Sequence, residues 1–191
     1  RYFMNGGMPR HVNYPEGYQM PITGNVSKME DKKPTTKRAD QLSWDDVDRL
    51  RDMFPGKLLI KGIMRADDAE EAIEHGVDGI VVSNHGGRNM DSAPAPIQVL
   101  PEIVKAVDGR MTVIVDSGVR RGSDIVKCIA LGADMVLAGR ATLYGTAAGG
   151  EAGAAKAIGI LKGEMKRTMA YIGTQRISNI TRDVIWEGSM P

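Results

Sequence analysis

The segment 81–91, VVSNHGGRNMD, joins two β-branched residues to a loop that carries a histidine and an arginine. His85 can take up a proton at physiological pH, because the unperturbed pKa of histidine lies near neutrality. Arg88 offers a fork of N–H donors to a carboxylate, and Gly86 and Gly87 let a ligand come close to the backbone. The segment therefore predicts a base beside a carboxylate-binding arginine. The alternative is a structural histidine, which is the commoner role of a lone one.

Two later segments, VDSGVRRGSD and LAGRATLYG, each place glycine and arginine before a predicted helix. Glycine lets backbone N–H groups approach an anion, a helix N-terminus attracts negative charge, and arginine binds phosphate oxygens in a bidentate manner. One such motif is as readily an ordinary turn with surface charges. Two in consecutive units favour a phosphate site. The residues concerned are Asp116, Gly118, Arg120, Arg121, Gly139 and Arg140.

Lys61 is a further candidate site residue, near the end of the apolar run KLLIKGI over 57–63. A lysine there faces the mouth of a barrel, where its charge can stabilise a negative ligand. The alternative is an exposed lysine at a strand end.

Four short runs, apolar almost throughout, position these side chains: 57–63, 79–84, 111–118 and 135–140. Lack of alternation is typical of parallel strands buried on both faces. Helical patterns separate the runs, and two of them end at glycines suited to a helix C-terminus. The three helical patterns cover 67–76, 96–107 and 122–132.

Strands that alternate with helices predict an α/β fold with right-handed crossovers. We also expect a serine-capped helix at 43–54, a long helix at about 151–172 and a short one near 178–186. The polar residues all follow the C-terminal ends of their strands. This is the ligand edge of a β/α barrel, and equally of an open doubly wound sheet.

Composition and charge exclude several classes of protein. The net charge of +1 gives no large basic field for nucleic acid. Cys128 is the single cysteine, cannot form an internal disulfide, and is expected to be buried. No apolar run is long enough to span a bilayer and no signal peptide is evident. We expect a cytoplasmic protein, with the inner face of the membrane as the alternative; nothing in the sequence indicates membrane association.

The segments SNHGGRNMD, VDSGVRRGSD and LGADMVLAGR closely resemble the FMN-dependent L-2-hydroxy acid oxidases and dehydrogenases. This family includes glycolate oxidase, L-lactate dehydrogenase and mandelate dehydrogenase. The resemblance runs from about residue 40 to the end. It implies a TIM (β/α)8 barrel, of which residues 41–191 carry the C-terminal half, strands five to eight. It also implies FMN as cofactor and no metal.

The resemblance implies a role for each matching residue. His85 corresponds to the base that takes a proton from the substrate, and Arg88 to the arginine that holds its carboxylate. Lys61 corresponds to the lysine that stabilises the reduced flavin. The remaining matches are cofactor contacts: Ser83 to the flavin ring, Asp116, Gly118 and Arg120 to the ribityl chain and phosphate, and Gly139 and Arg140 to the phosphate. The reaction implied is oxidation of an L-2-hydroxy acid, lactate-like or mandelate-like, to the 2-oxo acid.

Family members begin with four further β/α units, so we expect this chain to be the C-terminal half of a longer protein. Activity then needs the N-terminal half-barrel, in the same chain or in a partner. Residues 1–40 correspond to the irregular lid or loop after strand four, and the family habit is a tetramer. Two alternatives stay open. One is an incomplete half-barrel that binds FMN or phosphate without turnover. The other is a different FMN barrel such as a flavin-dependent isomerase, which the NHGGR loop disfavours.

Overall fold

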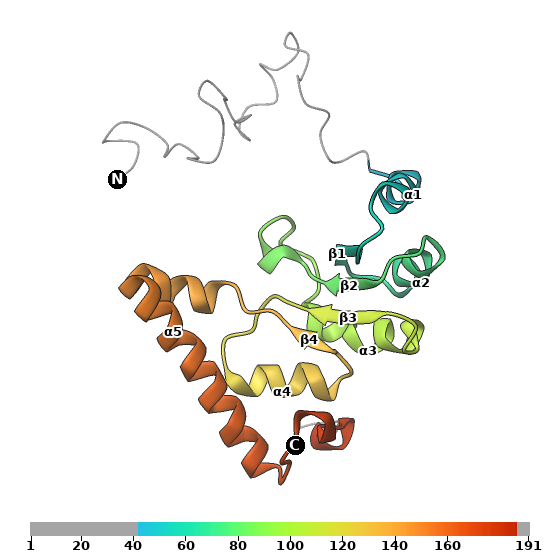
Figure 1. Cartoon of the computed structure of the whole chain (residues 1–191). Helices are drawn as coiled ribbons and strands as arrows, with labels where there is room; N and C mark the ends of the chain where they lie inside the picture. Colours follow the sequence, from blue (N-terminus) through green and yellow to red (C-terminus); the bar gives the residue numbers. More distant parts are fainter. Residues whose placement is uncertain (1–41, 187–191) are drawn as a thin grey trace, which may run out of the picture. The chain divides into compact units, whose positions relative to one another are not determined.

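The computed structural model describes residues 42–186, and residues 43–186 belong to the unit Ser43–Pro191 (Figure 1). The lid predicted over 1–40 lies outside the described residues.

A four-stranded parallel sheet forms the centre of this unit. Its strands are β1 (Leu59–Ile63), β2 (Gly79–Val82), β3 (Thr112–Val115) and β4 (Met135–Val136). Each strand pairs with the next along the chain, in the order β1-β2-β3-β4. Parallel neighbours need a crossover connection, and here it is a helix each time: α2 (Ala66–Glu74), α3 (Pro96–Val107) and α4 (Gly122–Ala130). An unreversed order is that of successive β/α units in a barrel, whereas a doubly wound sheet reverses direction at its switch point.

Burial along the strands follows their place in the sheet. All four residues of β2 and the last three of β3 are buried, as predicted for strands covered on both faces. The outer strands have one neighbour each within residues 42–186, and they are more exposed. Leu59 on β1 is 44% exposed and Met135 on β4 is 54% exposed.

The main core lies between the sheet and helices α2 and α3. Ile80 and Val82 of β2 pack with Leu100 and Ile103 of α3, and all four are fully buried. Burial of each such side chain stabilises the fold by about 1.5–3 kcal/mol. Cys128 belongs to the same cluster, which confirms its predicted burial, and that burial raises the pKa of its thiol to about 11.

The predicted helix boundaries are confirmed at several ends. Helix α1 (Trp44–Met53) follows Ser43, whose N–H donates to Asp46 Oδ2 at 2.9 Å. Gly76 after α2 and Gly132 after α4 take left-handed φ values of 68° and 99°. Glycine adopts this conformation without the steric cost of a Cβ, which is why the chain turns there.

Helix α5 (Arg140–Tyr171) begins earlier than the predicted helix over 151–172. Its early part is separated from the rest by Gly149 and Gly150, whose backbone is not helical. The later part passes beside α4 (Figure 1). The short helix predicted near 178–186 is instead two 3-10 turns, Ile177–Asn179 and Arg182–Val184.

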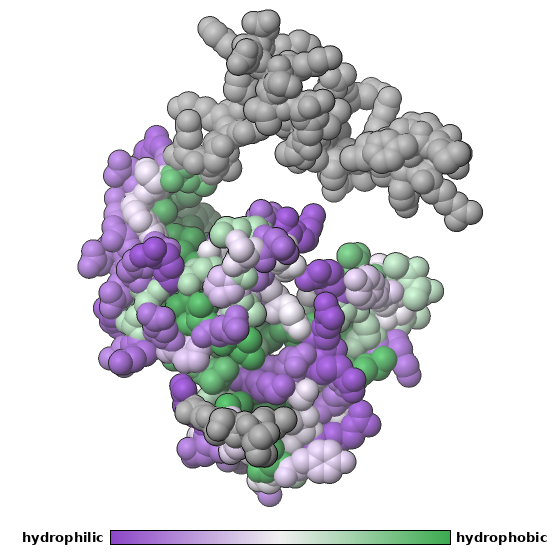
Figure 2. All heavy atoms as spheres, turned by 180° about the vertical axis from the view of Figure 1, so that it is seen from behind, coloured by the Kyte–Doolittle hydropathy of each residue, from purple (hydrophilic) through white to green (hydrophobic). Residues whose placement is uncertain are grey.

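Hydrophobic residues interrupt the hydrophilic surface in several places on the face drawn in Figure 2. No helix within residues 42–186 is both long enough and apolar enough to cross a membrane.

Candidate active site

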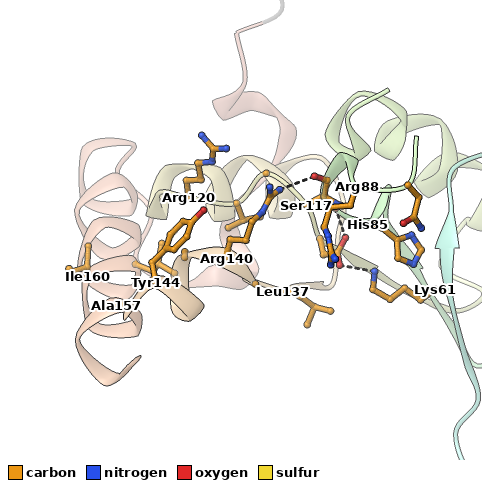
Figure 3. A pocket seen from close by; sticks show the side chains of 18 residues that line it. Lys61, His85, Arg88, Ser117, Arg120, Leu137, Arg140, Tyr144, Ala157 and Ile160 are labelled. Carbon is orange, nitrogen blue, oxygen red and sulfur yellow. Dashed lines mark hydrogen bonds and ion pairs between the residues drawn. The ribbon is translucent and has the colours of Figure 1, made fainter. Parts of the chain in front are cut away.

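Most of the polar residues predicted from the sequence converge on one cavity of about 730 Å³, at the ends of the four strands. Figure 3 shows Lys61 and His85 at one end, Arg120 and Tyr144 toward the other, and Ser117 and Arg140 between them. Such a volume is in the usual range for small-molecule sites. The predicted residues in its lining are Lys61, His85, Arg88, Asp116, Gly118, Arg120, Gly139 and Arg140.

Lys61 lies in a hydrogen-bonded group at one end of the cavity. Its Nζ is 2.9 Å from Asp116 Oδ2 and donates to Ser83 Oγ at 2.5 Å. The pairing of β1 with β2 is irregular between Lys61 and Ile63, where Gly62 has a φ of 107°. Such a bulge changes the direction in which a side chain points. The group therefore holds a cation at the cavity wall.

Asp116 is the anionic member of this group. Partial burial acts to raise the pKa of its carboxyl, but hydrogen bonds from Ser83, Lys61 and Ser117 together outweigh burial and lower it. Asp116 therefore stays ionised and keeps Lys61 in place. Ser83 is only 1% exposed and does not line the cavity; its hydroxyl contacts the lysine instead.

The loop after β2 holds His85 in a left-handed conformation, with φ 56°. Few residues other than glycine adopt it, although histidine does so more often than most. Asn84 supports the loop: its Oδ1 accepts from Gly87 N–H at 3.1 Å, and its Nδ2 donates to Pro94 O at 3.1 Å. An unusual backbone conformation retained at a cavity is a feature of functional sites. Arg88, three residues after His85 in the same loop, also lines the cavity.

The arginines that sequence analysis grouped together have different surroundings. Arg121 pairs with Glu164 at 2.8 Å, and Glu164 Oε2 also accepts from Gly122 N–H at 2.8 Å. The Gly122 N–H and then the Arg121 guanidinium lower the pKa of Glu164. The N-terminus of α4 is thus occupied by a carboxylate, and Arg121 is not in the cavity lining.

The N-terminus of α5, by contrast, lines the cavity. Gly139, Arg140 and Ala141 are all in the lining, together with Arg120. A Cβ added at Gly139 or Gly118 would meet nothing within 4 Å, so the backbone is open to a ligand there. Arg140 Nη2 donates to Gly86 O at 3.0 Å. This end of the cavity offers backbone N–H groups, a helix N-terminus and two guanidinium groups, which is the donor set that phosphate prefers.

Ser117 and Tyr144 are polar residues of the cavity lining that were missed from the sequence. Ser117 lies between Asp116 and Gly118 in the segment VDSGVRRGSD. Its polar side chain at the end of a strand could have identified it as a site residue. Tyr144 lies one helical turn after Arg140, and that spacing places both on one side of α5.

The chain matches the FMN-dependent dehydrogenase family over residues 7–187. It belongs to this family. The predicted resemblance is therefore confirmed, and so is the predicted fold, part of a (β/α)8 barrel.

Individual relatives agree with this family membership. The chain is 49% identical over 144 residues to 2-hydroxyacid oxidase 1 of Mus musculus, covering 75% of this chain and 39% of that protein. It is 43% identical over 185 residues to (S)-mandelate dehydrogenase of Pseudomonas putida, covering 96% of this chain and 45% of that protein. A crystal structure of the monotopic membrane protein (S)-mandelate dehydrogenase superposes with a TM-score of 0.74 at 46% identity, covering 77% of this chain and 39% of that one. The chain thus spans about two fifths of the length of these relatives.

The residues of the cavity fit FMN, the cofactor of the family. The cluster of Arg120, Arg140 and the open backbone at Gly118 and Gly139 suits the phosphate. Lys61, at the opposite end, suits the ring, because an ammonium group stabilises the negative charge of a reduced flavin. A long cavity with cations at both ends therefore matches a cofactor with a phosphate at one end and a redox-active ring at the other.

Proposed function

We propose that this chain carries the FMN site and part of the substrate site of an enzyme that oxidises an L-2-hydroxy acid to the 2-oxo acid. The observation that carries the proposal is that Lys61, His85 and Arg88 line one cavity with the phosphate-binding donor set around Arg120 and Arg140. A lactate-like or mandelate-like substrate fits the relatives, which include proteins named L-lactate oxidase and (S)-mandelate dehydrogenase.

Bound FMN would supply the two-electron acceptor that no side chain of the protein can provide. Arg88 binds the substrate carboxylate through two parallel hydrogen bonds and so orients the carbinol carbon. His85 accepts the proton that leaves the substrate, from its hydroxyl or its α-carbon. Lys61, fixed by Asp116, stabilises the negative charge that develops at the ring end of the cavity.

At the other end, Arg120, Arg140 and the backbone at Gly118 and Gly139 hold the cofactor phosphate. Asp116 and Ser83 act mainly on Lys61, whose ammonium group both contact. Asp116 also faces the cavity, where its carboxylate can accept hydrogen bonds from cofactor hydroxyls.

We further propose that the remaining β/α units of the family barrel complete the sheet at β1 and β4. Each of these strands has one paired edge within residues 42–186, and both carry exposed apolar residues. A tetramer stays a prediction. So does the cytoplasmic location, because the relatives include a peroxisomal (S)-2-hydroxyacid oxidase and a monotopic membrane protein, (S)-mandelate dehydrogenase.

The second candidate function is FMN or phosphate binding without turnover. His85 and Arg88 lie at the end of the cavity away from Arg120, where they are not needed to hold a phosphate. Their position favours the enzyme.

Replacement of His85 and Arg88 tests the proposal in the FMN-loaded protein. We expect His85→Gln to lower kcat by about 10²–10⁴-fold, the usual contribution of a general base. Arg88→Met should raise KM by about tenfold or more, because a charged hydrogen bond to the carboxylate is lost. Formation of the 2-oxo acid from L-lactate and from L-mandelate is the measurement.

His75→Gln is the matched control, since His75 lies outside the cavity and pairs with Asp48 and Glu71. Its kcat and KM should stay within about twofold of wild type. Equal activity of wild type and His85→Gln would remove His85 from the mechanism. FMN binding with no 2-oxo acid formed from any 2-hydroxy acid would favour the second candidate.

A further inference from the structure

The Ser117 hydroxyl joins two parts of the site that come from different strands. It accepts a hydrogen bond from Gly86 N–H at 2.9 Å and donates one to Asp116 Oδ1 at 2.8 Å. Gly86 directly follows His85, and Asp116 is the partner of Lys61. A single hydroxyl, through both of its hydrogen-bonding functions, therefore connects the loop of the base to the group that fixes the lysine.

The Gly86 peptide is also held through its carbonyl. Arg140 Nη2 donates to Gly86 O at 3.0 Å, and a Cβ at Gly86 would lie 2.8 Å from the same nitrogen. The residue after His85 is thus held from two sides, by the loop after β3 and by the start of α5 (Figure 3). His85 N–H itself donates to Ser83 Oγ at 3.2 Å, so these contacts hold the backbone that carries the imidazole on both sides of its peptide link to Gly86.

Ser117 has a left-handed backbone, with φ 72°. Glycine would take this conformation without steric cost, whereas a serine is strained in it. The two hydrogen bonds of the hydroxyl offset that strain. Compared with glycine, the serine therefore contributes its hydroxyl and no advantage in backbone conformation.

We propose that Ser117 is a positioning residue, which fixes the Gly86 peptide and so holds His85 in the geometry that proton transfer requires. The inference rests on the proposed function for the role of His85, but the contact itself can be tested without activity. Ser117 acts through Gly86 and Asp116.

Two substitutions separate the hydroxyl from the backbone. Ser117→Gly removes the hydroxyl and relieves the strained φ, whereas Ser117→Ala removes the hydroxyl and keeps the strain. Thermal stability should differ between them, with Ser117→Ala the less stable. An effect that both variants share belongs to the hydroxyl, and an effect that follows their stability is merely structural.

The first readout is amide hydrogen exchange in peptides that cover residues 84–88 of the FMN-loaded protein. We expect the Gly86 amide to exchange about tenfold faster in both variants, because its acceptor is lost. The second readout is the single-turnover rate at which substrate bleaches the flavin absorption. It should fall about tenfold in both variants, with an increased isotope effect for substrate deuterated at the α-carbon. Ser123→Ala, outside the cavity lining, is the control and should change neither.

Unchanged exchange at Gly86 in both variants would overturn the contact. Faster exchange with an unchanged bleaching rate would overturn the positioning role. A bleaching rate that falls in Ser117→Ala but not in Ser117→Gly would assign the effect to strain and contradict the proposal. If no 2-hydroxy acid bleaches the wild-type flavin, the proposed function fails instead, and the exchange result alone decides the contact.

Discussion

Among single residues, Lys61 shows how the site can hold a cation in place by an ion pair with Asp116 and still leave part of its ammonium group available to a ligand. The ion pair at 2.9 Å and the bond to Ser83 leave Lys61 with a further N–H donor, and its side chain is partly exposed to the cavity. A group held in advance where charge develops need not reorganise during reaction, which makes its contribution large.

We therefore expect Lys61→Met to lower the rate of flavin reduction by about 10²–10³-fold. Lys57→Met is a matched control, because Lys57 also pairs with an aspartate, Asp78 at 2.7 Å, but lies outside the cavity and is 83% exposed. Stopped-flow absorbance with saturating substrate measures both rates. Equal losses in the two variants would show that the loss of a lysine–aspartate pair, and not the position of Lys61, causes the effect.

At the scale of elements, close packing between α4 and α5 positions the wall of the cavity. Gly122 begins α4, and a Cβ there would lie 2.0 Å from the backbone nitrogen of Met165 in α5. Glu164 adds a polar tie to the same point by accepting from Gly122 N–H. The two helices can approach this closely only because residue 122 has no side chain.

Gly122→Ala should accordingly lower the free energy of unfolding by about 3 kcal/mol, since a backbone contact has to open. Gly159→Ala, at an exposed position of α5 where a Cβ meets nothing within 4 Å, should raise it by about 1 kcal/mol. Urea denaturation followed by circular dichroism compares the two. A Gly122→Ala protein as stable as wild type would contradict the described packing.

Helix α1 is attached to α2 by a contact that depends on pH. His75 stacks on Trp44 with ring centroids 5.2 Å apart, and its ring nitrogens lie 2.6 Å from Asp48 Oδ1 and 3.4 Å from Glu71 Oε1. The hydrogen bond to Asp48 raises the pKa of His75, and Glu71 adds to this against the opposing effect of partial burial.

A pKa raised on folding stabilises the protein below the unfolded value of about 6.5, and this contribution is lost as pH rises through the folded pKa. The melting temperature of wild type should therefore fall relative to that of His75→Gln as the pH is raised above 6.5. Differential scanning calorimetry of both proteins between pH 5.5 and 8.5 measures this difference in melting temperature, over a range that extends about one to two pH units either side of the unfolded pKa. Parallel curves would show that His75 gains no proton affinity on folding.

Much of this arrangement could be predicted from the sequence because it depends on short-range pattern. Apolar runs without alternation gave the strands, and Gly76 and Gly132 marked two helix ends correctly. What could not be predicted depends on contacts distant in sequence. The pairing of Arg121 with Glu164 removes that arginine from the cavity, and the contact of Arg140 with Gly86 joins residues 54 positions apart. The early start of α5 was missed because Gly149 and Gly150 separate it from the longer periodic part.

At the scale of the whole molecule, the described sheet has the form of consecutive units of a barrel with both outer strands available for further pairing. Leu59 and Met135 lie exposed on these strands. Native proteins usually bury both faces of a parallel sheet and protect the edges of its outer strands. The chain spans 39% and 45% of the length of its mouse and Pseudomonas putida relatives. We therefore expect activity only in a protein or complex that contains the complete barrel.

A visible absorption spectrum tests directly whether the cavity holds FMN for oxidation of a 2-hydroxy acid. The purified protein is measured without oxygen, before and after addition of L-lactate and then of L-mandelate. We predict a flavin band that is bleached by one of the two substrates. A protein that contains the complete barrel and shows no flavin band, or a band that no 2-hydroxy acid bleaches, would contradict the proposed function.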